Sequence, residues 1–596
     1  MPAYKAPLDE IRFLLHDVHD VAQLAALPGF EEATPDVIDA VLTEGAAICE
    51  QVLFPINQSG DAEGVQLVDG EVKTPTGFKE AYTQYAGGGW TGISADPAYG
   101  GQGLPEAVRF VMEEMLCSAN LSFSMYPGLS HGAYSAMMSH GSEEIKQRFL
   151  AKLVDGTWSG TMCLTEAHAG TDLGIIHTKA VPAGDGAYKI TGSKIFISAG
   201  EHDLTENILH LVLAKLPDAP GGTKGISMFL VPKYLPTEEG KPGTRNGVTV
   251  GSIEHKMGIK ASATCVLNFD NATGWMVGEA HKGMRAMFVM MNGARLAVGM
   301  QGLGLSEVAY QNALAYAKER LQGRSLTGPK NPEGPADPII VHPDVRKGLL
   351  RIKAFNEGMR SLAYWMGIRI DLEHRHPDAA VRQEAEDVIA LLTPVLKAFL
   401  TDKGFDNTNI ALQTLGGHGY IKEYGIEQYV RDARIAQIYE GTNAVQALDL
   451  VGRKLPTDGG RLVRRFFEMV KADIDAAAAD PSTEEFTKPL GASLYQLQKA
   501  TGMLAERGFA NPDEAGAAAT EYLHLMGYVA VGWQWLRMVT VAKAKLAAGG
   551  GDTRFYEAKI KTARFYMARL LPEAATLLAA IQSGAAPIMA MAAEEF

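Results

Sequence analysis

Cysteine is scarce in this chain. Its 596 residues include only four cysteines, and none of them forms a CxxC pair: Cys49, Cys117, Cys163 and Cys265. This spacing provides neither a disulfide framework nor a zinc site, and it is typical of proteins in a reducing compartment. We therefore expect buried free thiols, no metal centre and a cytoplasmic location.

Long apolar runs are also missing. Stretches such as LHLVLAKL and MRAMFVMM end at charges or turns, well short of the ~20 residues that a membrane span requires. The first twenty residues acquire acidic side chains at once, unlike a secretory signal peptide. We expect neither a membrane span nor a cleaved leader.

No long run of lysine or arginine is present, and the formal net charge is −14. An acidic chain without a segregated basic face repels phosphate backbones, so nucleic acid is not expected as a partner. The composition, 46% hydrophobic and 21% charged, is that of a folded globular protein. The length predicts three or four packed units.

The hydrophobic periodicity changes twice along the chain. From about Pro35 to Gly156 apolar residues recur mainly at helical spacing. Alternating β-branched runs follow to about Met276, and long amphipathic helical repeats return from Gly283. The Pro/Gly-rich segment GRSLTGPKNPEGPADPIIVHPD predicts a loop between two of these helices. The predicted class is mainly α with a central β domain. The expected domains are an N-terminal extension with a helical domain (1–157), a β domain (158–277), a helical bundle (278–455) and an additional helical domain (456–596).

Four separated segments carry residue types that suit a cofactor or a proton transfer. LTEAHAGTD (164–172) offers two hydroxyls on a turn, and KIFISAGEHD (194–203) places an aromatic ring beside a hydroxyl. AYAKERLQGR (315–324) with LQTLGGHGY (412–420) supplies an arginine, an amide and glycines, and RDARIAQIYEGTNAVQ (431–446) holds a glutamate before a Gly-Thr turn. Taken singly, such segments also occur as helix caps, strand cores, surface ion pairs or solvated charges.

In this order and spacing, the segments resemble the signature motifs of the acyl-CoA dehydrogenase family, such as LTEPxAGSD, KxWITNG and RDAKIxxIYEGTxxIQ. HKMGIKASATCVLNFDN (255–271) resembles a further strand motif of that family. The resemblance covers roughly residues 40–450. It implies the family's fold, in which a helical domain, a β-barrel-like domain and a helical bundle follow one another, here with an extra C-terminal helical domain.

The resemblance implies FAD as the cofactor. Contacts to the flavin ring would come from Met162, Leu164, Thr165, Gly170, Thr171, Phe196 and Ser198. Contacts to the ADP half of the FAD of a neighbouring subunit would come from Arg320, Gln413, Gly416 and Gly417. Thr442 is the remaining residue expected to bind the cofactor. Hydroxyl and backbone donors stabilise a reduced flavin, and an arginine suits a pyrophosphate. The chain departs from the family's usual residues at several positions, with Ala167 for proline, Thr171 for serine, Phe196 for tryptophan, Ser198 for threonine and Gly323 for phenylalanine.

The same resemblance assigns Glu440 as the catalytic base. The α proton of a thioester is a weak acid, so its removal needs an aimed, desolvated carboxylate. Some family members carry the base before an arginine in a segment matching MNGARLAVG (291–299), where this chain has Ala294, which supports Glu440 as the only base. Contacts to the acyl-CoA would come from Asn292, Arg295, Tyr439 and Gly441.

Segments on both sides of the common core make a long form, similar to the bacterial 3-methylmercaptopropionyl-CoA dehydrogenases of dimethylsulfoniopropionate breakdown. This similarity implies oxidation of 3-(methylthio)propanoyl-CoA to 3-(methylthio)acryloyl-CoA, electron-transferring flavoprotein as acceptor and a homodimer. A general short- or medium-chain fatty acyl-CoA dehydrogenase, a flavin oxidase and a DNA-binding flavoprotein on the same fold remain alternatives. The last is disfavoured, because acidic residues soon follow Arg461, Arg464 and Arg465.

Overall fold

The computed structural model describes residues 2–549 and 551–596 and divides the chain into two compact units. The bundle unit comprises Met1–Ala46, Pro105–Ser118 and Val298–Phe596, and the barrel unit comprises Ala47–Leu104 and Ala119–Ala297. Two long helices, α5 (Glu106–His140) and α7 (Gly283–Glu319), contribute residues to both units.

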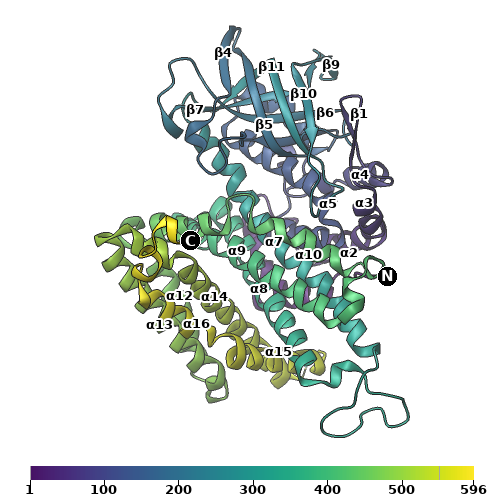
Figure 1. Cartoon of the computed structure of the whole chain (residues 1–596), viewed down its shortest axis with the longest axis vertical. Coiled ribbons are helices and arrows are strands. Elements are labelled where there is room, and N and C mark those ends of the chain that lie inside the picture. The colour runs from purple at the N-terminus through teal and green to yellow at the C-terminus, as the bar shows by residue number, and fades with distance from the viewer. Residues whose placement is uncertain (1, 550) are drawn as a thin grey trace. The chain divides into compact units, whose positions relative to one another are not determined.

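Seven strands of the barrel unit form one sheet (Figure 1). They are β3 (Trp158–Cys163), β4 (Lys179–Gly184), β5 (Ala187–Ser198), β6 (Asn207–Lys215), β7 (Ile226–Pro232), β10 (Val248–Ile253) and β11 (Thr264–Val277). Strand β7 pairs with both β11 and β6, so the sheet closes on itself. Its interior is filled by side chains such as Ile190, Val212, Phe229 and Leu267. The predicted barrel-like β domain is confirmed.

The helices of the barrel unit include α3 (Asn57–Glu63), α4 (Phe78–Gly87) and α6 (Glu143–Val154). The region before residue 157 is mainly helical as predicted, and it also contains an unpredicted hairpin of β1 (Gln66–Val68) and β2 (Glu71–Lys73). Asp69 and Gly70 turn this hairpin with positive φ at both positions, the conformation that an Asp-Gly pair favours. The hairpin was missed because its strands are only three residues long.

The bundle unit is built on α7, α8 (Pro343–Arg375) and α9 (Ala379–Thr414), with the shorter α10 (Ile426–Arg434) and α11 (Asn443–Asp449). The predicted loop lies between α7 and α8. Further helices of the unit include α12 (Arg461–Ala477), α13 (Glu484–Ala510), α14 (Pro512–Ala548), α15 (Thr553–Phe565), α16 (Glu573–Ser583) and α17 (Ala586–Met589). Helix α14 contacts both α8 and α9 (Figure 1). No helix within the described residues is long and apolar enough to cross a membrane.

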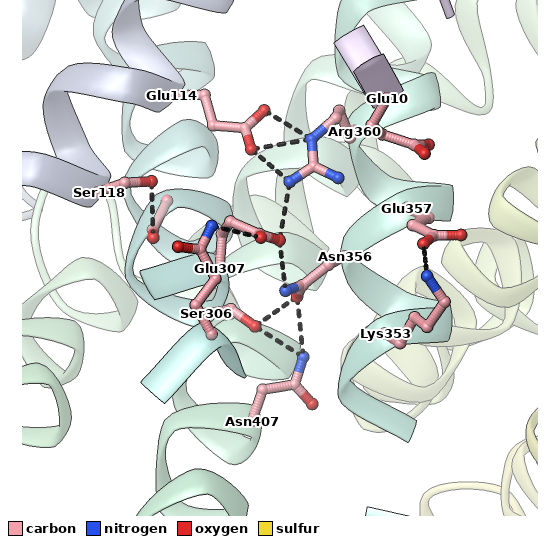
Figure 2. Close-up of polar contacts among 12 residues, drawn as sticks. Glu10, Glu114, Ser118, Ser306, Glu307, Lys353, Asn356, Glu357, Arg360 and Asn407 are labelled. Carbon is pink, nitrogen blue, oxygen red and sulfur yellow. Dashed lines mark hydrogen bonds and ion pairs between the residues drawn. The ribbon is translucent and has the colours of Figure 1, made fainter. Parts of the chain in front are cut away.

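A buried polar network ties the bundle unit together (Figure 2). The Arg360 guanidinium donates to Glu114 at 2.6 Å and to Glu307 at 2.9 Å, and all three side chains are almost fully buried. The Lys559 ammonium of α15 lies 2.8 Å from the Glu357 carboxylate and also pairs with Glu10, close to the N-terminus. Burying these charges is tolerable only because each is paired. The two ends of the chain are therefore anchored on helix α8.

Candidate functional site

In the barrel unit, a buried ion pair joins the two segments predicted to hold the flavin ring. The Lys194 ammonium of β5 donates to the Glu166 carboxylate at 2.8 Å and to the Leu164 carbonyl at 2.9 Å. The Ile195 amide donates to the Thr165 carbonyl at 2.9 Å. Burial opposes ionisation of Glu166, but Lys194 outweighs it and lowers the pKa of Glu166 to about 2. The loop after β3 is therefore fixed against β5.

Phe196 is presented outward by a bulge in β5. Two residues of β5, Ile195 and Phe196, oppose the single residue Val266 of β11. Phe196 has a φ of +58°, uncommon for a bulky residue, and its side chain is 60% exposed. Bulges re-aim side chains next to functional sites, and exposed strained aromatics need a functional explanation. The geometry is therefore compatible with a ring that contacts a ligand.

The hydroxyl groups predicted to face the flavin remain unused by the fold. Among the described residues, no group forms a hydrogen bond with the side-chain hydroxyls of Thr165, Thr171 or Ser198. The space where a side chain at Gly170 would lie is also open. Met162 is partly buried at the end of β3, and Leu164 is buried. Their roles as flavin contacts stay predictions.

Glu166 also belongs to a group of potential metal ligands with His168 and His177, whose ligand atoms lie within 4.8 Å of one another. The carboxylate already accepts hydrogen bonds from Lys194, from Thr178 at 2.6 Å and from the His177 amide at 2.6 Å. His168 Nε2 lies 3.0 Å from the Ile175 carbonyl. These polar atoms are used in holding the loop, so we assign no metal to them.

In the bundle unit, Glu440 stands in a loop of unusual backbone conformation. It has a φ of +57° and is followed by Gly441 with a φ of +84°. A β-carbon at residue 441 would approach Gln446 Nε2 to 2.6 Å, so Gln446 would have to move, and the positive φ itself favours glycine. Thr442 then caps α11, because its hydroxyl accepts the Val445 amide at 3.3 Å. The loop thus turns sharply between two short helical segments.

Polar side chains hold the carbonyl groups of this loop. The Lys397 ammonium, on α9, donates to the Gly441 carbonyl at 2.9 Å and to Asn443 Oδ1 at 2.8 Å. Gln446 Nε2 donates to the carbonyls of Glu440 at 3.3 Å and Gly441 at 3.2 Å. A left-handed non-glycine residue persists only where its surroundings over-determine it. These contacts supply that constraint.

Tyr439, predicted to contact substrate, donates its phenolic hydrogen to Gln301 of α7. Burial, and next the negative charge of Glu440, raises the pKa of Tyr439 well above its ordinary value. The phenol is therefore a neutral donor. Its contact with substrate stays a prediction.

The residues predicted to bind the ADP half of FAD lie at one end of the bundle helices. Tyr316 of α7 hydrogen-bonds His418 Nδ1 at 2.8 Å, which ties the segment before Arg320 to the turn that contains Gly416 and Gly417. Arg320 and both glycines are exposed, and the space beside each glycine is open. Gln413 lines a cavity of about 660 Å³ together with the cationic side chains of Lys347, Arg351 and Arg569.

The remaining predicted substrate contacts lie on the part of α7 that belongs to the barrel unit. Arg295 is buried and its guanidinium lies 3.4 Å from the exposed Asn292 side-chain oxygen. Its guanidinium also lies 6.0 Å from the centre of the Phe288 ring. Ala294, at the alternative base position, carries no titratable group.

Sequence reasoning missed the residues that hold the Glu440 loop: Lys397, Asn443 and Gln446. One signal for them exists, because Lys397 interrupts the otherwise apolar helical stretch PVLKAFL. A lysine on a buried helix face must find an acceptor, but the sequence does not show which one.

Comparisons with known proteins complete the description of the site. Models of the acyl-CoA dehydrogenase N-terminal, middle and C-terminal domains match residues 62–157, 161–272 and 281–455, and a model described as acetyl-CoA dehydrogenase C-terminal like matches 466–592. A 3-methylmercaptopropionyl-CoA dehydrogenase of Ruegeria pomeroyi is 43% identical over 571 residues, 96% of each chain. The chain belongs to the acyl-CoA dehydrogenase family. It is therefore an oxidoreductase of a flavin-dependent family that acts on the CH–CH bond of acyl-CoA thioesters.

Other acyl-CoA dehydrogenases agree with this assignment. A butyryl-CoA dehydrogenase of Syntrophomonas wolfei is 37% identical over 96% of this chain and 95% of its own length. The structure of an acyl-CoA dehydrogenase complexed with FAD from Bacillus anthracis matches with a TM-score of 0.74 over 98% of this chain and 92% of its own, at 19% identity. That likeness shows the fold, and it confirms the acyl-CoA dehydrogenase fold with additional C-terminal helices.

Proposed function

We propose that this acyl-CoA dehydrogenase uses Glu440 to remove the α proton of an acyl-CoA thioester, with FAD as its cofactor and the trans-2-enoyl-CoA as product. The observation that carries the base assignment is the loop itself: a carboxylate on a left-handed residue whose backbone is held by Lys397 and Gln446. An aimed carboxylate is what removal of a weakly acidic α proton requires. The Glu440 backbone N–H is proposed to donate to the thioester oxygen and so stabilise its developing charge.

The residues present fit FAD. The exposed Phe196 ring, the unused hydroxyls of Thr165, Thr171 and Ser198, and the exposed Arg320 are suited to a flavin and a pyrophosphate, and none of them is needed to complete the fold. FAD, when bound, would accept the β hydrogen as a hydride. Gln413, Gly416 and Gly417 are proposed to bind the ADP half of the FAD of a second subunit.

For the substrate we propose 3-(methylthio)propanoyl-CoA, oxidised to 3-(methylthio)acryloyl-CoA. The support is the 43% identity to the Ruegeria pomeroyi enzyme over nearly the whole of both chains. The alternative is a short straight-chain acyl-CoA, favoured by the 37% identity to a butyryl-CoA dehydrogenase over a similar span. Asn292, Arg295, Tyr439 and Gly441 are proposed to contact the acyl-CoA.

The setting of the enzyme is part of the proposal. We propose electron-transferring flavoprotein as the acceptor, a homodimer as the assembly and the cytoplasm as the location, with the four domains divided as expected from the sequence. All four cysteines are free and buried, and burial raises the pKa values of Cys163 and Cys265 to about 12. Such thiols are inert, as suits a protein of a reducing compartment.

The alternative from another class, a DNA-binding flavoprotein, has little support in the C-terminal helices. Arg461 and Arg465 of α12 lie 3.1 and 3.2 Å from the buried Asp387 carboxylate of α9. Arg464 donates to the Gly459 carbonyl. These cations stabilise the bundle unit, so they do not form a free basic face for phosphates.

Anaerobic bleaching of the flavin near 450 nm tests the proposal. Purified holoenzyme is mixed with 3-(methylthio)propanoyl-CoA and with straight-chain acyl-CoAs of increasing length. We expect fastest bleaching by the methylthio substrate; preference for butyryl-CoA would select the alternative. Glu440→Gln is expected to keep FAD and bind substrate but not bleach, and bleaching at the wild-type rate would overturn the base assignment.

A further inference from the structure

We propose that the C-terminal helix α14 positions the Glu440 loop through one side chain, His524, which acts on the loop by way of Asp402 of α9. This inference rests on the proposed role of Glu440 as the base. It assigns to the additional C-terminal helices a part in the chemistry that goes beyond completing the fold.

A continuous path of hydrogen bonds within the bundle unit carries the inference. His524 Nε2 lies 2.9 Å from one oxygen of the Asp402 carboxylate. The other Asp402 oxygen accepts from Gln437 Nε2 and from Asn443 Nδ2, both at 2.7 Å. Gln437 precedes Glu440 by three residues and Asn443 follows it by three. Asp402 therefore holds both ends of the segment that presents the base.

The middle of the segment is held from the same helix. Asn443 Oδ1 accepts from Lys397, which also donates to the Gly441 carbonyl. Lys397 is fully buried, and it lies on α9 little more than one turn before Asp402. The left-handed Glu440–Gly441 pair is thus surrounded by one network whose outer member is His524.

The charge state of Asp402 depends on these contacts. Burial alone would raise the pKa of Asp402, but the hydrogen bond and charge of His524, with the amides of Gln437 and Asn443, outweigh burial and lower it. An ionised carboxylate accepts stronger hydrogen bonds than a neutral one. Loss of the His524 donor would therefore weaken the hold of Asp402 on both flanks of the loop.

His524 is a suitable target because its surroundings allow a matched pair of substitutions. Its ring packs 5.6 Å from the Phe399 ring and its side chain is only slightly exposed. In His524→Gln the amide nitrogen can occupy the place of Nε2, whereas in His524→Asn the amide is too short to reach Asp402. Both variants carry a polar side chain without the charge of His524, so they differ from each other chiefly in the contact under test.

The experiment measures the rate constant of flavin reduction and the Kd of the acyl-CoA by stopped flow, using holoenzyme and the acyl-CoA that bleaches the wild type fastest. In His524→Asn we expect the rate constant of flavin reduction to fall at least about 10-fold, because a displacement of the base by less than 1 Å already lowers the rate. His524→Gln is expected to stay within about 2-fold of the wild type, and the Kd and the FAD content are expected to change little in either variant.

His16→Leu is the control, because His16 forms a similar pair with Asp39 at 2.9 Å in the N-terminal segment and has no contact with the loop. The inference would be overturned if His524→Asn reduced the flavin at the wild-type rate. It would also be overturned if the rate fell in His524→Asn and fell equally in His524→Gln. If His524→Asn does not retain FAD, Asp402→Asn is judged by the same rate criterion. Glu440→Gln is measured beside them: bleaching by that variant refutes the base itself, whereas its failure to bleach together with a normal His524→Asn rate refutes only the positioning role.

Discussion

Replacing Lys194 by methionine should release the loop that is proposed to face the flavin. The substitution keeps the length of the apolar stem but removes the ammonium group, which donates to Glu166 and to the Leu164 carbonyl. Lys194 is fully buried and Glu166 is 5% exposed. The variant therefore leaves a buried carboxylate without its cation and a backbone carbonyl without its donor.

The size of the effect follows from these two losses. Removing one partner of a buried ion pair costs about 3–5 kcal/mol, because the remaining charge is not compensated. Glu166 keeps its hydrogen bonds from Thr178 and the His177 amide, so the lower end of this range is expected. A loss of about 3 kcal/mol corresponds to an opening equilibrium more populated by roughly 100-fold, since 1.4 kcal/mol is a factor of ten.

Amide hydrogen exchange followed by mass spectrometry on peptides covering residues 164–198 measures this opening. We expect exchange about 100-fold faster in Lys194→Met, together with weaker FAD binding. Lys189 lies on β5 like Lys194, and its ammonium makes an exposed contact with Thr273 of β11. Lys189→Met removes this contact and should leave exchange in the loop unchanged. Adding Glu166→Gln to Lys194→Met should restore part of the protection. Exchange within about 3-fold of the wild type in Lys194→Met would show that the pair does not hold the loop.

Three further predictions concern pH, backbone and chain ends. The pKa of Glu166 is lowered to about 2, whereas that of an unfolded glutamate is about 4.3. The stability that Glu166 contributes is therefore full above about pH 4.3 and declines towards pH 2. The difference in melting temperature between the wild type and Glu166→Gln should shrink over this range. Gly441→Ala places a β-carbon against Gln446 at a φ of +84°. The variant should reduce the flavin about 100-fold more slowly in stopped flow. An unchanged rate would show that the loop tolerates displacement. Lys559→Met leaves Glu10 and Glu357 buried without the cation they share and should lower the apparent melting temperature by about 5 °C. Adding Glu10→Gln to the same chain should reduce this effect.

Periodicity in the sequence predicts most of the fold. The change to alternating β-branched residues after Thr157 coincides with β3, and the return of helical spacing at Gly283 coincides with the start of α7. The pairing of β7 with two partners could not be predicted, because local pattern does not specify which strands meet. The three-residue strands of the β1–β2 hairpin are too short to show alternation.

The candidate site was only partly accessible from sequence. The motif around Glu440 identifies the loop, but not the support for its conformation, because Asp402 and His524 are 122 residues apart in the chain. Likewise, the left-handed φ of Phe196 arises from its mismatch with β11, which no property of KIFIS reveals. Such contacts depend on tertiary packing, whereas motif resemblance predicts only which residues contact the ligand.

The shared anchoring of both chain ends on α8 limits how modular this enzyme can be. A fragment cut after residue 455, the end of the match to the family's C-terminal domain, would lose Lys559 and His524 at once. Glu10 and Asp402, which both lie before the cut, would then each lose a partner. A minimal catalytic fragment would therefore need compensating changes at both positions.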